Sequence, residues 1–322
     1  MELFIYQQIK KAIEQTQRAL IVSHRKPDGD TLGASLALSL VFKDLNKDYF
    51  LFCQDKIEKQ FSFIGETYKY SQSKEGVIQF NPDFIFCFDC ADLKQTGFED
   101  IKEKFPKAKV INIDHHISNP SYGDVNLVDA NASSTCEILY YLLKEIDISI
   151  TKQIATMIFL GIFTDTNNFS NSATTPRSLF AASELWHYGI LISEIQKNLF
   201  KNKTISFLRL WGLALERIKY NENLKIASTY ITGDDLASLG IDGDSLDGLS
   251  NFLNANLNVE TIAVLKDLGD GIIKGSLRTI SDEIDLSKLA RVFGGGGHKK
   301  ASGFSVKGKI KTIGNSWFMC LD

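Results

Sequence analysis

The chain of 322 residues carries 36 basic and 39 acidic residues, for a net charge of −3, and 44% of its residues are hydrophobic. This length fits two domains of about 100–200 residues each, and the small net charge excludes bulk attraction to long nucleic acids or an anionic membrane. No apolar run approaches the ~20 residues of a membrane span, and an odd number of cysteines, 5, is typical of a reducing compartment, so we expect a cytoplasmic protein.

The first half of the chain alternates predicted strands with predicted helices. Its first segment, MELFIYQQIKKAIEQ, is amphipathic with helical spacing, which predicts a helix rather than a signal peptide. The strands predicted after it lie at residues 18–24, 50–53, 83–88, 109–113 and 125–128, and the helices lie at residues 31–44, 133–143, 151–163 and 176–188. This alternation favours a mostly parallel α/β sheet flanked by helices.

The first predicted strand ends in the motif His24-Arg-Lys-Pro-Asp28-Gly-Asp30. Its proline fixes φ and its glycine permits a sharp turn, so His24, Asp28 and Asp30 can converge on one point. Neutral imidazole with carboxylate oxygens suits Mn²⁺, Mg²⁺ or Fe²⁺. Asp30 alone fits a helix N-cap equally well, but the three side chains together favour metal ligation.

Two later strands also end in acidic or histidine residues. Asp89 follows the apolar run 84–88, where an unpaired carboxylate would be costly, so a cation or hydrogen-bond donors must meet it. The next strand, rich in Val and Ile, is followed by Asp114-His115-His116. Ligands gather beyond the carboxyl ends of strands in open parallel sheets, although two adjacent histidines alone also fit a solvated turn.

Asp165 is a further acidic residue that leaves a buried element, because it follows the apolar run 157–163. Several carboxylates cannot share a pocket without cations, since like charges would force proton uptake. Two divalent ions about 3.5–4 Å apart, bridged by a shared carboxylate, would relieve this repulsion and form a centre that cleaves phosphoesters. For Arg177, near the start of the last predicted helix of this half, we favour a surface position over contact with a phosphate.

These motifs resemble those of the DHH phosphoesterase superfamily, in the same order along the chain. The resemblance implies two divalent ions, for which we expect Mn²⁺, with Mg²⁺ as the alternative. The ligands that it implies are His24 and Asp28 on one ion, Asp30, His115 and Asp165 on the other, and Asp89 between them. It further implies that His116 faces the scissile phosphate and that Asp114 fixes the orientation of a histidine.

The second half of the chain ends in a glycine-rich basic region. Strands are predicted at 224–231, 259–265 and 271–280, with a helix at 286–293 before the four glycines 294–297. Successive glycines let backbone N–H groups approach an anion closely, although a glycine run by itself also fits a flexible turn. Six basic residues and no acidic residue lie between Arg291 and Lys311, which supplies a local basic patch.

This loop resembles the Gly-Gly-Gly-His-x-x-Ala-x-Gly signature of the DHHA1 domain, which accompanies DHH domains and binds the nucleotide end of the substrate. The substrate contacts that it implies are Arg278, Gly295, Gly296, Gly297 and His298. We therefore expect a DHH catalytic domain at residues 1–189, a helical linker at 190–217 and a smaller α/β DHHA1 domain at 218–322.

A DHH–DHHA1 chain of this length is similar to the bifunctional oligoribonucleases and pAp phosphatases. The similarity implies a hydrolase that cuts RNA of about two to five nucleotides to mononucleotides and converts pAp to AMP. Two alternatives stay open: a phosphodiesterase for pApA or cyclic dinucleotides such as c-di-AMP, and a non-catalytic nucleotide-binding regulator. A regulator would lack metal ligands and none is missing, so we favour an enzyme. Its expected partners are short RNA and nucleotides, not a membrane, and its oligomeric state stays open between a monomer and a homodimer.

Overall fold

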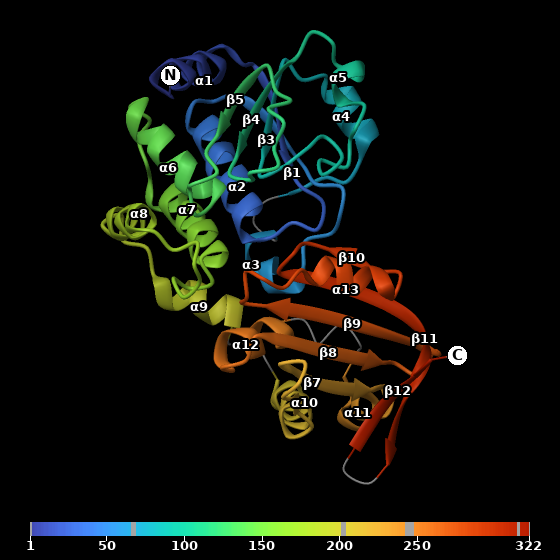
Figure 1. Cartoon of the computed structure of the whole chain (residues 1–322). Helices are drawn as coiled ribbons and strands as arrows, with labels where there is room; N and C mark the ends of the chain where they lie inside the picture. Colours follow the sequence, from blue (N-terminus) through green and yellow to red (C-terminus); the bar gives the residue numbers. More distant parts are fainter. Residues whose placement is uncertain (1, 66–68, 201–203, 242–247, 314–315, 322) are drawn as a thin grey trace. The chain divides into compact units, whose positions relative to one another are not determined.

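A computed structural model describes residues 2–65, 69–200, 204–241, 248–313 and 316–321 (Figure 1). The chain divides into two compact units, Met1–Asn202 and Lys203–Asp322. Each unit contains one β-sheet with helices packed against it, which confirms the predicted α/β class. The exact limits predicted for the two domains and for the linker at 190–217 stay a prediction.

The first unit is built on a parallel sheet of five strands in the order β2-β1-β3-β4-β5. Its elements are, in chain order, α1 (Glu2–Gln15), β1 (Arg18–Ser23), α2 (Gly29–Asp44), β2 (Asp48–Phe52), the 3₁₀ helix η1 (Lys59–Phe61), α3 (Ser62–Gly65), α4 (Lys74–Phe80), β3 (Phe84–Phe88), α5 (Ile101–Lys104), β4 (Lys109–Asp114), β5 (Val125–Val128), α6 (Thr135–Glu145), α7 (Lys152–Asp165), α8 (Pro176–Trp186) and α9 (Ile192–Phe200).

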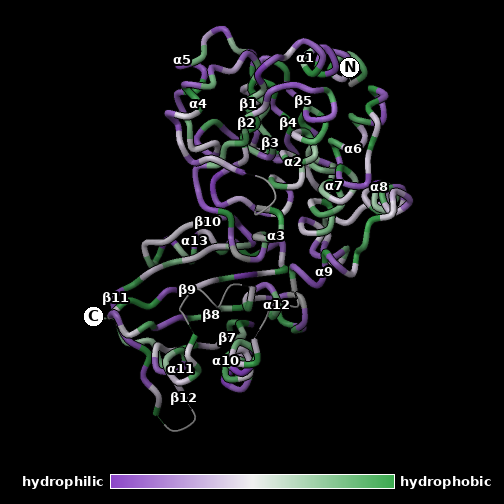
Figure 2. The backbone as a smooth tube through the Cα atoms, turned by 180° about the vertical axis from the view of Figure 1, so that it is seen from behind, coloured by the Kyte–Doolittle hydropathy of each residue, from purple (hydrophilic) through white to green (hydrophobic). Residues whose placement is uncertain are grey.

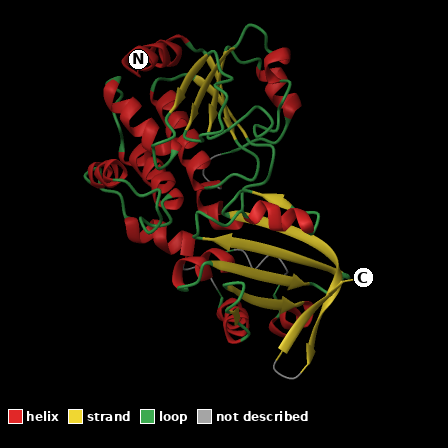
Figure 3. Ribbon diagram, viewed as in Figure 1, coloured by secondary structure: helices red, strands yellow, loops and turns green. Residues whose placement is uncertain are grey.

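Both faces of this sheet are covered, which explains why its central strands are apolar without alternation. Along β1, Ala19 and Ile21 belong to the core formed with α2 and α7, whereas Leu20 and Val22 belong to a smaller core on the other face, which includes residues of α4 and α5. Figure 3 shows these helices on the two sides of the strands. All five strands start at one edge, so their carboxyl ends share the opposite edge.

Helix α2 lies inside the unit and is mostly hydrophobic along its length (Figure 2). It can approach α7 closely because both helices present a glycine at the crossing. A Cβ at Gly33 would collide with the carbonyl oxygen of Met157, and a Cβ at Gly161 would lie 2.6 Å from Oδ1 of Asp30. This close packing brings the start of α2 beside the end of α7, and so brings the first acidic motif near Asp165.

The second unit contains a sheet of seven strands in the order β10-β11-β9-β8-β7-β6, with β12 paired to β11. Its elements are α10 (Ile205–Glu216), β6 (Lys219–Asn221), β7 (Ile226–Thr232), α11 (Gly233–Leu239), α12 (Leu249–Asn256), β8 (Thr261–Asp267), β9 (Ile272–Thr279), α13 (Leu286–Val292), β10 (Gly296–Gly297), β11 (Ala301–Ile313) and β12 (Ser316–Leu321). The sequence predicted β7, β8, β9 and α13 but not the long β11–β12 hairpin, because the lysines and glycines of β11 are typical of a basic loop.

Each face of the second sheet carries its own core. Ile262 and Val264 of β8 pack with residues of α10, α11 and α12, whereas Leu265 packs with α13 and the inner side of β11. In the part of the chain that the structure describes, no helix is both long enough and apolar enough to cross a bilayer.

Candidate metal centre and nucleotide loop

The predicted metal ligands converge at the carboxyl edge of the first sheet. They leave the ends of β1, β3 and β4, the first turn of α2 and the last residue of α7. Three overlapping groups of side chains there have candidate ligand atoms within 4.8 Å of one another: His24–Asp28–Asp89, Asp30–His115–Asp165 and Asp89–His115–His116. The elements that carry these residues are far apart in sequence but end at one place, as the parallel topology requires.

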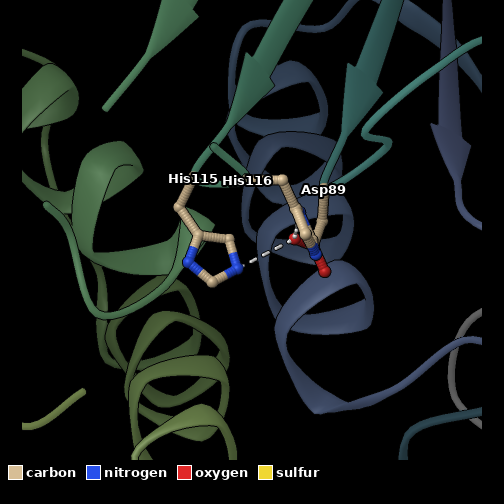
Figure 4. Close-up of side chains that lie close together, drawn as sticks. All are labelled: Asp89, His115 and His116. Carbon is tan, nitrogen blue, oxygen red and sulfur yellow. Dashed lines mark ion pairs between the residues drawn. The ribbon is translucent and has the colours of Figure 1, made fainter. Parts of the chain in front are cut away.

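Asp89 lies between His24 of the first group and His115 of the second group. Its Oδ2 is 3.2 Å from Nε2 of His24. Its Oδ1 is 3.4 Å from Nε2 of His115, an ion pair drawn in Figure 4. The side chain is only 2% exposed. Since one carboxylate oxygen faces each group, Asp89 has the geometry of a ligand shared by two ions.

The first motif is organised by the start of α2. Asp28, rather than Asp30, is the N-cap of this helix, and its Oδ1 accepts hydrogen bonds from the N–H groups of Asp30 and Thr31 at 3.0 and 3.1 Å. The same oxygen lies 3.5 Å from Nε2 of His24. The N-cap alternative for Asp30 is therefore wrong, because the cap is formed two residues earlier.

Asp30 is instead held by the start of helix α6. Its carboxylate is buried and accepts hydrogen bonds from the backbone N–H groups of Thr135 at 2.6 Å and Cys136 at 2.9 Å. The hydroxyl of Thr135 donates to Oδ1 of Asp89 at 3.1 Å. One residue therefore fixes two predicted ligands, and the N-terminus of α6 favours the negative charge of Asp30.

His115 completes the second group. Its Nε2 lies 3.3 Å from Oδ2 of Asp165, the last residue of α7. Both neighbouring histidines approach Asp89 (Figure 4): Nε2 of His115 and Nδ1 of His116 lie 3.4 and 3.5 Å from its Oδ1. The end of β4 thus brings both imidazoles to the same carboxylate.

His116 is oriented by Asp114. The Nδ1 of His116 lies 2.8 Å from Oδ1 of Asp114, and that oxygen also accepts the N–H group of His115 at 2.8 Å. Oδ2 of Asp114 accepts a hydrogen bond from the side chain of Asn119 at 2.5 Å. Asp114 is fully buried and His116 is 40% exposed. Because Asp114 occupies Nδ1, the imidazole presents Nε2 outwards.

The charged groups of the cluster shift one another's pKa values strongly. Burial alone would lower the pKa of His24, but hydrogen bonds with Asp28 and Asp89 raise it to about 11. Burial likewise opposes the charge of His115, yet Asp89 and the other carboxylates raise its pKa to about 10.

The pKa values of the carboxyl groups in the cluster shift in opposite directions. Burial and the charge of Asp89 raise the pKa of Asp30 to about 7, and burial with the charge of Asp30 raises the pKa of Asp165 well above its ordinary value. Burial opposes ionisation of Asp89 as well, but the hydrogen bonds from His115 and His24 hold its pKa below its ordinary value. Carboxylates this close together repel one another and take up protons. A divalent cation relieves the same repulsion, so such a cluster favours cation binding.

The donor set therefore fits divalent ions with a preference for nitrogen and oxygen ligands. Imidazoles and carboxylates are the donors in all three groups, and no thiolate is among them. Such a set suits Mn²⁺ or Mg²⁺ better than an ion that prefers sulfur.

Arg177, for which the sequence favours a surface position, is tied to the loop before α6. Its Nη1 is 2.6 Å from Asp129 and its Nε is 3.2 Å from the buried Glu137. The other oxygen of Glu137 accepts the N–H group of Ser133. Arg177 therefore helps to hold the segment that delivers Thr135 to the acidic cluster.

In the second unit, the glycine loop lies beside Arg278. The strand β10 pairs Gly297 with Ser302, and Ala301 pairs with Arg278 of β9. A Cβ at Gly295 would come within 2.6 Å of the backbone of Phe304, so the loop has no room for a side chain there. His298 is exposed.

Arg278 is fixed by a residue that sequence reasoning missed. Its Nε donates to Oδ1 of Asn251 in α12 at 2.7 Å, and its Nη1 donates to the carbonyl of Leu277 at 2.9 Å. Burial lowers the pKa of Arg278. Asn119, Thr135 and Asn251 were all missed for the same reason: each supports a predicted residue through a contact that no local motif reveals.

Two family matches coincide with the two units. Residues 18–162 match the DHH family, N-terminal domain, and residues 223–313 match the DHHA1 domain. The chain thus has a DHH domain followed by a DHHA1 domain.

Alignments with individual relatives cover nearly the whole chain. The chain is 28% identical to a protein of Thermus thermophilus, and to one of Bacillus subtilis, both named bifunctional oligoribonuclease and PAP phosphatase NrnA. The alignments cover 94% of this chain and 87% of the first relative, and 89% of both this chain and the second. An exopolyphosphatase-related protein from Bacteroides fragilis has a similar structure, with a TM-score of 0.85 and 26% identity, covering 94% of this chain and 90% of that one.

Proposed function

We propose that this protein is a metal-dependent phosphoesterase that hydrolyses short oligoribonucleotides, about two to five nucleotides long, to mononucleotides and dephosphorylates pAp to AMP. The observation that carries the proposal is the position of Asp89, with one carboxylate oxygen facing each of two histidine–carboxylate groups. The two relatives named bifunctional oligoribonuclease and PAP phosphatase support this choice of substrates.

The proposed ligands of one ion are His24 and Asp28, those of the other are Asp30, His115 and Asp165, and Asp89 is shared. Two divalent ions held in this way would stabilise charge on the phosphate oxygens and activate water for attack on phosphorus. We propose Mn²⁺ as the physiological ion. Magnesium is the alternative with the same oxygen and nitrogen preference.

The roles of the other residues follow from their geometry. His116 presents Nε2 outwards and is proposed to stabilise charge on the scissile phosphate or to give a proton to the leaving oxygen. Asp114 orients it. Hydrolysis breaks one P–O bond and adds one water. The leaving oxygen must therefore gain a proton, whether it is a ribose oxygen of RNA or the 3′-oxygen of pAp.

Substrate binding is proposed for the DHHA1 domain. The backbone N–H groups of Gly295, Gly296 and Gly297, together with His298 and Arg278, are suited to an anionic nucleotide end. We further propose a cytoplasmic location, which agrees with the five free cysteines.

A substrate panel tests the function. The chain is assayed with Mn²⁺ on pAp, RNA of two to five nucleotides, pApA, c-di-AMP and pyrophosphate, with an Asp89→Ala variant as the control for contaminating enzymes. We expect AMP from pAp and mononucleotides from RNA, both lost in the variant. Turnover of c-di-AMP or pApA without turnover of pAp and RNA would replace the proposal by the dinucleotide phosphodiesterase alternative.

A further inference from the structure

The sheet of the second unit exposes a row of lysines on one face. Lys307, Lys309 and Lys311 alternate along β11 with residues that are buried or half-buried, and all three are exposed. Lys274 of β9 is also exposed, and its register partner is Ser305. Because alternate residues of a strand point to the same side, these lysines share one face of the sheet.

The cores of the unit identify that face. Val306 and Ile310, which have the opposite parity to the lysines along β11, pack against the core that includes residues of α13. The lysine face is therefore the opposite one, where Ile262 of β8 packs against the core of α12 and pairs with Arg278. Arg278 and Lys274 are four residues apart on β9, so the proposed nucleotide contact and the lysines lie on the same side.

The hairpin adds an aromatic side chain to this face. Phe318 of β12 is the register partner of Lys311 and is 51% exposed. No acidic residue occurs between 301 and 313, and among the residues described here none of the four lysines forms an ion pair. Protection of a sheet edge is one use of strand lysines, but it does not account for Lys274, because β9 lies between β8 and β11.

Positive charge in a row beside an exposed aromatic ring fits single-stranded nucleic acid. Alternate strand residues are about 6.6–6.8 Å apart, which is comparable with the separation of neighbouring phosphates in an extended strand. Proteins that bind single strands combine a basic track for the backbone with aromatic rings on which bases stack. Because the small net charge of the whole chain does not attract RNA, any electrostatic attraction must come from a local group of basic residues such as this row.

We propose that Lys274, Lys307, Lys309, Lys311 and Phe318 form a basic strip that binds the backbone of single-stranded RNA beyond its terminal nucleotide. The inference rests on the proposed function and extends it, because pAp and a dinucleotide are too short to reach along the strip. RNA of five nucleotides would gain affinity from the lysines, and Phe318 would stack one base.

The test compares two triple variants with equal change in net charge. The strip variant carries Lys307→Gln, Lys309→Gln and Lys311→Gln. The control variant carries Lys11→Gln, Lys43→Gln and Lys107→Gln, three exposed lysines of the first unit. Binding of a fluorescent five-nucleotide RNA is measured in excess chelator, so that the RNA is not cut, and kcat/KM for pAp and for the same RNA is measured with Mn²⁺.

We expect the strip variant to bind the five-nucleotide RNA at least 10-fold more weakly, with a salt dependence shallower by about 2 in log–log slope. Its kcat/KM should fall for this RNA and stay near the control value for pAp. Phe318→Ala should weaken RNA binding with an unchanged salt slope.

Equal RNA binding by the strip and control variants would overturn the proposed RNA-binding strip. It would also be overturned if the wild type attached to phosphatidylserine vesicles but did not bind RNA. If the wild type binds RNA but turns over neither RNA nor pAp, the proposed function fails while the strip survives. A wild type that cleaves both, with no difference between the variants on RNA, contradicts the strip alone.

Discussion

Asp89 has a left-handed backbone conformation, with φ of 59°, although it is not a glycine. Such a conformation costs about 1–3 kcal/mol and persists only where the surroundings determine it. Its N–H group donates to the carbonyl of Ile113 at 3.0 Å, which ties the residue after β3 to the end of β4. The turn directs the carboxylate into the cluster, at the position of the proposed shared ligand.

Thr135 is predicted to position Asp89. Thr135→Val removes the hydroxyl but keeps the backbone N–H group that binds Asp30. We expect affinity for Mn²⁺ to fall about 10–100-fold, measured by calorimetry, and Thr135→Ser to restore most of it. Thr156→Val is the matched control. Unchanged affinity in Thr135→Val would show that the hydrogen bond to Asp89 has no part in metal binding.

His116 is predicted to act on the substrate and not on the metal. His116→Ala should keep both ions while kcat for pAp falls by about 10²-fold or more. His187→Ala, at the C-cap of α8, is the control. The experiment must distinguish this role from metal binding, because Asp89, His115 and His116 also form a candidate metal group. A loss of metal content in step with activity would make His116 a ligand.

At the scale of elements, the crossing of α2 and α7 determines where the acidic residues meet. Glycine normally destabilises a helix interior relative to alanine, yet Gly161 lies where a Cβ would press on Cys136 and come 2.6 Å from Oδ1 of Asp30. The glycine therefore permits the contact that places Asp30 near Asp165.

Gly161→Ala and Gly212→Ala are predicted to have opposite effects. Gly161→Ala should lower stability by about 1–3 kcal/mol through overpacking and weaken metal binding. Gly212 lies in α10 with nothing within 4 Å of an added Cβ, so Gly212→Ala should raise stability by about 0.4–1 kcal/mol. Denaturant titration measures both, and a stabilising Gly161→Ala would contradict the packing.

Asp83 joins the start of β3 to the start of β1. Burial opposes its charge, but hydrogen bonds from the Thr16 hydroxyl and the N–H groups of Gln17 and Arg18 lower its pKa. A folded pKa below the unfolded value means that Asp83 stabilises the fold above the unfolded value, about 3.9, and that this stability is lost as the pH falls through the folded pKa.

Asp83→Asn should therefore lower Tm at pH 7, and the difference from the wild type should shrink as the pH falls below about 4. The exposed Asp48→Asn serves as the control. A difference in Tm that is the same at pH 7 and pH 3 would mean that the charge of Asp83 is not what matters.

Local patterns were sufficient to predict which side chains meet at the acidic cluster, but not the contacts that support them. His24, Asp89 and His115 could be predicted because they lie at the ends of apolar runs typical of strands, and Asp28 because it follows His24 in a Pro-Asp-Gly turn. The contact of Asp30 with Thr135 spans 105 positions in sequence, and no local pattern indicates it. The β11–β12 hairpin was not predicted because the three lysines and the glycines of β11 resemble a basic loop.

At the scale of the whole molecule, we propose that the two units perform different tasks. The first unit gathers six predicted ligands from strand ends and helix ends, and the second holds the glycine loop, Arg278 and the basic strip. Each task depends on a sheet whose register fixes the side chains. The central claim concerns the first unit, where Asp89 is proposed to join two ions.

Electron paramagnetic resonance of the chain saturated with Mn²⁺ tests that claim most directly. We predict two ions per chain and the spectrum of a spin-coupled pair, and we predict that the coupling is lost in Asp89→Ala. A wild type that is fully active on pAp with one magnetically isolated Mn²⁺ per chain would contradict the account.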